Sequence, residues 1–238
     1  MINDSHVHLG KSSGINQSLS ITDLMKFRQD FPYVNKVLVM GTDLDHRAIN
    51  DVLPKLCSEN EWLYGLCWIT NIHDTQIDIK GKIIGCKFHG AYMNMPVTHL
   101  SPFLLEKLEN KILLVHCGRY LEGDIKSNTS YLHALEVARK YPKIKVILAH
   151  MGGTDTTVCK KAIDHAAGLY NVYFDTSGIT TPYIIEYAIE QISVNRILFG
   201  SDTPWCSFNA MRWTVEDAMI LRTEKDYIFH DNFEVLLK

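Results

Sequence analysis

Eight short apolar runs recur along the chain of 238 residues, and stretches with helical periodicity separate them. The runs are residues 2–9, 36–42, 62–69, 83–89, 112–117, 145–150, 171–177 and 196–202. Continuous apolar runs of this length are typical of parallel strands, which are buried on both faces. Eight such strands alternating with helices predict an α/β protein built as a single (β/α)8 TIM barrel, with one domain over residues 1–238.

An open, doubly wound sheet is the alternative arrangement of the same elements. That fold normally carries a G-x-G-x-x-G turn after an early strand, and the sequence contains no such turn. The chain also shows no internal repeat, low-complexity segment or linker. The closed barrel is therefore the favoured prediction.

Charge and hydropathy limit the classes of partner. Lys and Arg total 24 against 27 Asp and Glu, so the formal net charge is −3 at pH 7. This balance offers no basic surface for nucleic acid and no polybasic patch for a membrane, and no apolar run approaches the length of a membrane span. We therefore expect a small-molecule substrate as the partner. The sequence leaves open a homodimer formed through an exposed apolar helix face.

The six cysteines form no C-x-x-C pair, and most of them fall inside apolar runs. Free cysteine in such runs behaves as a small buried hydrophobe. This usage favours reduced thiols and a cytoplasmic location over a disulfide framework. The first predicted strand begins at residue 2, so we expect no signal peptide before it.

Ionisable residues gather at the carboxyl ends of the predicted strands. These residues come from five different strands and are His8, Lys87, His89, His116, His150 and Asp202. Ionisable side chains are rare in buried strands unless each one is paired with a partner or has a functional role. Enzymes with this barrel carry their active sites at the carboxyl ends of the strands. The pattern therefore predicts an active site formed by these strand ends.

The first strand carries two histidines, His6 and His8, on either side of Val7. Side chains alternate along a strand, so both imidazoles point into the barrel while Val7 points toward the helices. A pair of hydrogen-bonded core histidines is the alternative interpretation. The other polar strand ends favour metal binding by both histidines, because neutral imidazole is a common metal ligand.

The later strand ends supply further candidates. Asp202 lies in the stretch FGSDTPW, where an inward carboxylate can bind a metal and accept a proton from water. Lys87 and His89 share one face of the fourth strand, and we expect both to contact substrate. Three roles stay open for Lys87: a carbamate that bridges two metals, a partner for a substrate carboxylate, or an ion pair with Asp202. Arg119, in the polar loop after the fifth strand, is a further candidate for a substrate carboxylate, with a solvated loop as the alternative.

These motifs together resemble those of a known family. HVH on the first strand, GCKFHGAY on the fourth, LLVHCG on the fifth, ILAHMGG on the sixth and LFGSDTPW on the eighth are similar to motifs of the amidohydrolase superfamily. More narrowly, they resemble its amidohydrolase-related branch of metal-dependent hydrolases and nonoxidative decarboxylases. The closing stretch DNFEVLL also resembles the C-terminal helix of that branch, so the likeness spans nearly the whole chain.

The resemblance implies a divalent metal, most often zinc. His6, His8 and Asp202 would hold it, and His116 would complete the site of a member with one ion. His150 would then be the free imidazole that activates water or polarises the substrate.

Members with two ions leave an alternative open. In them a carboxylated lysine on the fourth strand bridges both ions, and Lys87 stands at a suitable place for it. His116 and His150 would bind the second ion. We favour one ion and keep two as the alternative.

The constellation predicts hydrolysis by a metal-activated water. Asp202 would orient the water, take its proton and later deliver it to the leaving group, while His150 or the metal stabilises the charge on the carbonyl oxygen. The expected substrate is a small amide, ester or lactone that carries a carboxylate. A nonoxidative decarboxylase of the same branch is the alternative. A catalytically silent ligand-binding barrel is disfavoured because every metal-site position carries a suitable residue.

Overall fold

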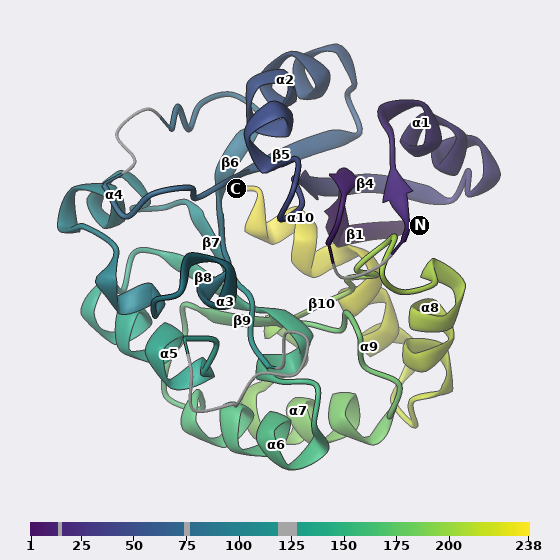
Figure 1. Ribbon diagram of the computed structural model, residues 1–238. Coiled ribbons are helices and arrows are strands. Elements are labelled where there is room, and N and C mark those ends of the chain that lie inside the picture. Colours follow the sequence, from purple (N-terminus) through teal and green to yellow (C-terminus); the bar gives the residue numbers. More distant parts are fainter. Residues whose placement is uncertain (14–15, 74–76, 119–127) are drawn as a thin grey trace.

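The barrel predicted from the sequence is confirmed by the computed structural model, which describes residues 1–13, 16–73, 77–118 and 128–238. One sheet contains eight parallel strands in chain order, and helices surround it (Figure 1). The strands are β1 (Ile2–His8), β4 (Val34–Met40), β5 (Leu63–Trp68), β6 (Ile83–Phe88), β7 (Ile112–Val115), β8 (Lys145–Leu148), β9 (Val172–Asp175) and β10 (Ile197–Leu198). Each of them overlaps one of the predicted runs.

The helices lie between the strands and after β10, and several of them begin at a side chain that caps the first turn. They are α1 (Ile21–Asp30), α2 (His46–Glu59), α3 (Gly90–Met93), α4 (Pro102–Lys107), α5 (Tyr131–Lys140), α6 (Thr156–His165), α7 (Tyr183–Ile192), α8 (Phe208–Asp217), α9 (Arg222–Asp226) and α10 (Asn232–Leu236). Ser20 is one example of such a cap, because its hydroxyl accepts a hydrogen bond from the amide of Asp23 in the first turn of α1.

Alternation along the strands divides the core into two layers. Val37 and Val39 of β4 pack in the outer layer between sheet and helices, whereas Leu38 and Met40 pack in an inner layer inside the barrel. Phe233 of α10 belongs to the inner layer. The C-terminal helix therefore closes one end of the barrel.

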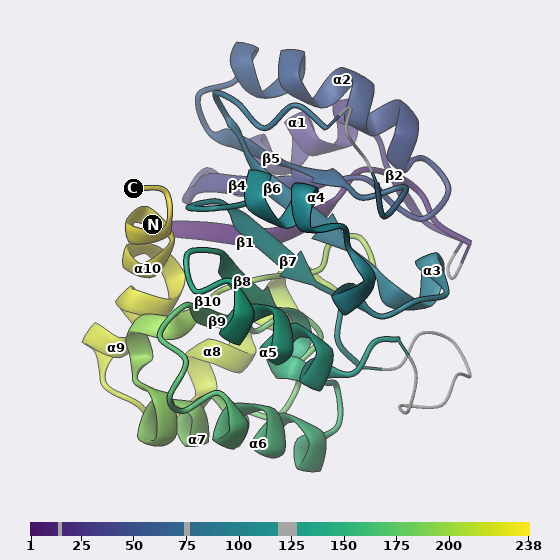
Figure 2. The same ribbon diagram turned by 90° about the vertical axis from the view of Figure 1, so that its left-hand side faces the viewer.

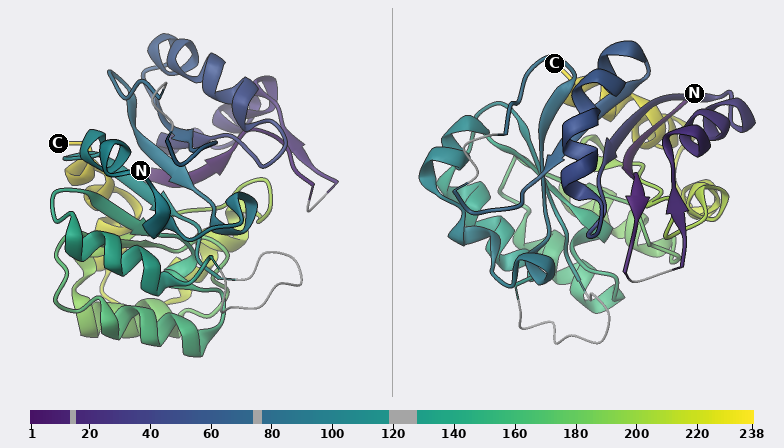
Figure 3. Two further views of the ribbon diagram at one scale, coloured as in Figure 1. Left: turned by 60° about the vertical axis from the view of Figure 1, so that its left-hand side comes forward. Right: turned by 45° about the horizontal axis from the view of Figure 1, so that its top comes forward.

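The two ends of the barrel differ in what covers them. Figure 2 shows α10 and both chain termini at one end, and α3 and β2 (Gly10–Lys11) at the other, toward which the strands run. β2 pairs with β3 (Ser18–Leu19), and Figure 3 shows this hairpin projecting beyond the barrel. The sequence did not predict this pair, because two-residue strands leave no periodic signal. The end opposite α10 is the end where the site lies.

The seam between β1 and β10 is joined differently from the other strand pairs. β10 spans two residues and pairs with β9, and in the described part of the chain one isolated bridge, Val7 to Thr203, links the segment after β10 to β1. Just past β10, the amide of Asp202 donates to the carbonyl of His6 at 2.8 Å. Residues of both strands that were predicted as metal ligands therefore meet across this seam.

The helices and cysteines agree with the expectations from composition. Within residues 1–13, 16–73, 77–118 and 128–238, no helix is both long enough and apolar enough to cross a bilayer. None of the six cysteines forms a disulfide, and all except Cys206 are buried. Burial raises the pKa of Cys57 and of Cys159 to about 12.

Thiol labelling of the folded protein is expected to be slow at the five buried cysteines. Burial and a raised pKa both suppress the thiolate, which is the reactive form. With Ellman's reagent at pH 8, we expect at most one thiol per chain, Cys206, to react within minutes, and all six to react in urea. Rapid reaction of two or more thiols in the folded protein would contradict this burial.

Candidate metal centre

Three ligand atoms converge at the carboxyl ends of β1 and β10. Nε2 of His6 lies 3.0 Å from Nε2 of His8. Oδ1 of Asp202 lies 3.6 Å from the first nitrogen and 3.4 Å from the second. Among the described residues, these three form the one group of His, Cys, Asp or Glu whose ligand atoms all lie within 4.8 Å of one another. The structure thus brings together the three residues that the sequence predicted as the core of a metal site.

The outer nitrogens of the two histidines fix their protonation. Nδ1 of His6 donates to Oδ2 of Asp175 at 2.9 Å, and Nδ1 of His8 donates to the carbonyl of Gly41 at 2.6 Å. Because a carboxylate and a carbonyl only accept, both protons reside on Nδ1. In the neutral form of each ring, the Nε2 lone pair therefore faces the other ring and the carboxylate of Asp202.

This donor set fits a divalent cation. Three lone-pair atoms in such proximity repel one another, and a cation bound among them would replace that repulsion with attraction. Two imidazole nitrogens bound to one tetrahedral zinc are about 3.3 Å apart, given Zn–N distances of ~2.0–2.1 Å. A histidine whose second nitrogen bonds a carboxylate or carbonyl is also the usual form of a metal ligand.

Lys87 lies beside the three ligands. Its Nζ donates to Nε2 of His6 at 3.2 Å, and its side chain is fully buried. Burial lowers the pKa of Lys87 to about 8, although Asp202 opposes the shift. Burial, helped by the charge of Lys87, lowers the pKa of His6 to about 4, so His6 is neutral at neutral pH, as a ligand must be.

Asp202 occupies a strained backbone position. Its φ of 57° lies in the left-handed region, which non-glycine residues avoid. Such strain persists where the surroundings impose it, commonly at functional sites. Burial raises the pKa of the Asp202 carboxyl, but the imidazoles of His6 and His8 outweigh it and hold the pKa below its usual range. The carboxylate is therefore ionised and aimed at the two histidines.

Asp175, at the end of β9, is a functional candidate that the sequence reasoning missed. Besides binding His6, its carboxylate accepts hydrogen bonds at Oδ1 from the amides of His150 and Ser177, at 3.0 and 3.1 Å. Burial raises the pKa of Asp175, but the charge and hydrogen bond of His6 outweigh it and hold the pKa at about 2. The available signal was a carboxylate inside the apolar run NVYFDTS.

Asp175→Asn is expected to weaken metal binding roughly 10–100-fold, because the amide no longer holds His6 with its proton on Nδ1. Competition with a chromophoric chelator measures the dissociation constant. Asp164→Asn is a suitable control, since Asp164 is an exposed carboxylate that bonds Tyr187 on the surface. An affinity within threefold of the wild type for Asp175→Asn would rule out this orienting role.

His150 follows β8 in a tight turn with a left-handed φ of 58°. Its Nδ1 donates to the carbonyl of Ser177 at 3.1 Å, so its Nε2 carries the lone pair. That nitrogen lies 3.1 Å from Nδ1 of His116, which donates to it. The ring of His150 also stacks on that of His6, with centroids 5.4 Å apart. His150 and His116 therefore form a hydrogen-bonded pair next to the three converging ligands.

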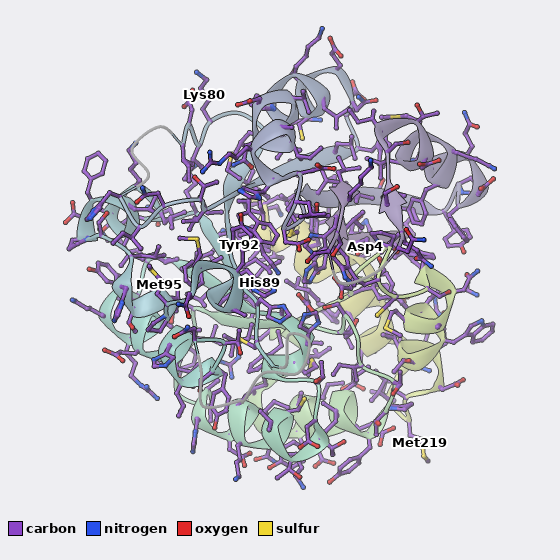
Figure 4. All side chains as sticks on the ribbon, in the orientation of Figure 1. Asp4, Lys80, His89, Tyr92, Met95 and Met219 are labelled. Carbon is purple, nitrogen blue, oxygen red and sulfur yellow. The ribbon has the colours of Figure 1, made fainter. Side chains whose placement is uncertain are left out.

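His89 extends this row of imidazoles. Its ring stacks on that of His116 with centroids 3.9 Å apart, and its Nδ1 accepts from the amide of Tyr92 at the start of α3. Burial lowers the pKa of His89 and of His116 well below the usual value, so both are neutral. Figure 4 shows His89 and Tyr92 toward the middle of the view along the barrel. Arg119, the remaining candidate, lies outside the described residues.

A cavity of about 320 Å³ lies between the segments that follow β7 and β8. Gly118 and Gly152, each two residues beyond one of the paired histidines, contribute to its lining, together with Thr129 and Asp155. A cavity of this size accommodates a small organic molecule.

Comparisons with known proteins agree with this geometry. A crystal structure of 2,6-dihydroxybenzoate decarboxylase from Rhizobium superposes with a TM-score of 0.75 at 16% identity, covering 99% of this chain and 98% of that chain. A dihydroxybenzoic acid decarboxylase from Polaromonas, with bound manganese and an inhibitor, superposes with a TM-score of 0.75 at 16% identity, covering 99% of this chain and 97% of that chain. An amidohydrolase from Burkholderia multivorans with bound zinc superposes with a TM-score of 0.74 at 13% identity, covering 99% of this chain and 98% of that chain.

These likenesses establish the fold, and the sequence itself establishes the family. No curated protein matches this chain in sequence. The family model Amidohydro_2, described as amidohydrolase, matches residues 80–237, which is more than half of the chain. The chain therefore belongs to the amidohydrolase family of enzymes.

Proposed function

We propose that this enzyme is a metal-dependent hydrolase that cleaves an amide, ester or lactone bond in a small molecule carrying a carboxylate. The observation that supports it best is the convergence of two Nε2 lone pairs and one carboxylate oxygen from His6, His8 and Asp202. Such a set provides metal ligands and a proton acceptor in one place.

The metal is the first part of the proposal. Relatives of the same fold hold manganese or zinc, which supports a divalent cation here. We favour zinc, because two imidazoles and a carboxylate suit its preference for nitrogen and oxygen ligands in a tetrahedral site. When bound, the cation acts as a Lewis acid that lowers the pKa of water to ~7 and polarises a carbonyl.

The chain's own residues supply the proton transfers. Asp202 is ionised and accepts the proton of the attacking water, then returns it to the leaving group. His150 holds its own Nδ1 proton against the carbonyl of Ser177, and its Nε2 accepts from His116, so Nε2 is a second acceptor for water once His116 releases it. Lys87, buried and protonated below a pKa of about 8, offers its ammonium to the substrate carboxylate.

A site with two ions is the alternative for the metal count. Lys87 with a pKa of about 8 has a neutral fraction near pH 7–8, and carboxylation requires the neutral amine. Its carbamate would bridge the ions, with His116 and His150 as ligands of the second. One ion remains the proposal, with His116 as its further ligand, because a single group of converging ligand atoms occurs in the described residues.

A decarboxylase is the second candidate function, and one observation favours it. Two tryptophan rings flank His8, with Trp205 at 4.6 Å and Trp68 at 6.1 Å between centroids. Such an aromatic wall suits a planar, unsaturated acid. Two of the structural relatives are decarboxylases of dihydroxybenzoic acids.

One set of assays separates these proposals. Elemental analysis of protein purified without added metal is expected to give about one zinc per chain, whereas about two would favour the carboxylated lysine. Lactones, esters and amides are then assayed for hydrolysis, and aromatic acids for release of CO₂. Hydrolysis that is lost on chelation and restored by zinc is the expected result. CO₂ release alone would favour the decarboxylase, and the absence of both metal and activity would favour a silent barrel.

We also propose a reducing compartment, the cytoplasm, as the location. The six cysteines support it, since none of them forms a disulfide.

A further inference from the structure

Asp4 is a fully buried residue on β1 that the proposed chemistry does not use, and burial raises the pKa of its carboxyl group to about 7. Figure 4 places it within the ring of helices. Its Oδ1 accepts two hydrogen bonds, from the amide of His6 at 3.1 Å and from the amide of Ser201 at 2.9 Å. Ser201 directly precedes Asp202. Oδ1 of Asp4 therefore binds the backbone at His6 on one side of the seam, and next to Asp202 on the other side.

The first of these bonds compensates an irregularity in β1. Asp4 pairs with Val37 of β4, but Val7 pairs with Val39, so three steps on β1 match two on β4. A bulge of this kind removes amides from the regular ladder of hydrogen bonds. The amide of His6 lies in the bulge and is satisfied by Asp4 instead. The bulge also sets the direction in which His6 leaves the strand.

The second bond crosses the barrel seam. Here the strands lack a continuous ladder, so the position of the Ser201–Asp202 segment depends on a few individual bonds. Gly200 makes the close approach possible, because a Cβ there would lie only 3.1 Å from Cβ of His6. Asp4 ties this segment to β1 at the residue before the ligand.

We propose that Asp4 is the positioning residue that sets the spacing between His6 and Asp202, and thereby the affinity of the metal centre. The role requires an acceptor oxygen at Oδ1, and the second oxygen takes no part, since Oδ2 has no hydrogen-bond partner among the described residues. The proposal rests on the proposed metal site for its effect on affinity, but the two hydrogen bonds are independent of any metal.

Variants of the full chain test the effect on affinity. Asp4→Ala is expected to weaken zinc binding roughly 10–100-fold by chelator competition, and to shift the visible absorption bands of the cobalt-substituted protein. Asp4→Asn keeps an acceptor oxygen and is expected to stay within about threefold of the wild type. Ser5→Ala is the matched control, because the hydroxyl of Ser5 also bonds across the seam, but to the carbonyl of Phe199 at 2.8 Å.

The outcomes are distinguishable. If Ser5→Ala weakens zinc binding as much as Asp4→Ala, general loosening of the seam explains the result and the proposal fails. It also fails if Asp4→Ala retains wild-type affinity, or if Asp4→Asn loses affinity tenfold or more. Should Asp4→Ala not fold, scalar couplings in the wild-type protein, from the amide nitrogens of His6 and Ser201 to Cγ of Asp4, decide whether the two bonds exist. A wild-type protein that binds no zinc but shows these couplings would overturn the proposed function, and with it the role of Asp4 in metal affinity. The two hydrogen bonds of Asp4 would still be established.

Discussion

Replacing His8 with alanine is expected to remove the divalent cation and to lower kcat/KM by roughly 10³-fold or more, since the cation provides several kcal/mol of stabilisation to the transition state. The variant loses one of the three converging ligand atoms, and we expect the donors that remain, with His116 as the further ligand, to hold the ion too weakly against water. His8 lies near the mouth of the barrel with its ring between tryptophans, so the fold is expected to survive. Elemental analysis and steady-state kinetics on the same preparation measure both effects.

His46→Ala is the matched control for this variant. His46 is also buried and also packs against Trp68, but its Nδ1 donates to the carbonyl of Asp43 and it is outside the ligand group. We expect this control to keep its metal. Full metal content in His8→Ala, or equal loss in both variants, would show that the centre is assembled differently.

Asp202→Asn is expected to lower kcat by roughly 10²–10⁴-fold, with a smaller change in KM, because it removes a general base while keeping the size of the side chain. The amide still offers an oxygen to the cation, so we expect metal binding to weaken but to persist at saturating zinc. Asp217→Asn, an exposed position on α8, controls for the change in net charge. A kcat within threefold of the wild type would assign the proton transfer to another group, with His150 the next to test.

The candidate site was predictable to the extent that its residues interrupt strongly apolar runs. His6, His8 and Asp202 stand at strand ends, and the direction of parallel strands places those ends together. Asp175 and Asp4 also lie in buried strands, yet they were missed. Their carboxyl groups accept hydrogen bonds from backbone amides and from a ring nitrogen of His6. The spacing of residues in the sequence does not indicate such partners.

The roles of the row of histidines depended on structure in the same way. Sequence placed His89, His116 and His150 at neighbouring strand ends. It did not reveal that His116 donates to His150, or that His89 stacks on His116 and caps α3. Such contacts depend on side-chain rotation about χ angles, which periodicity along a strand does not constrain.

The sequence by itself determined the barrel, its strand order and the end that carries the chemistry, because burial and alternation are properties of short segments and act before any distant contact forms. Only the tertiary structure decided the protonation and orientation of the ligands. His6 and Asp175 are separated by 169 residues, and Asp4 and Ser201 by 197, so these partners meet only when the barrel closes. The lone pairs that face one another across the seam are a product of that closure.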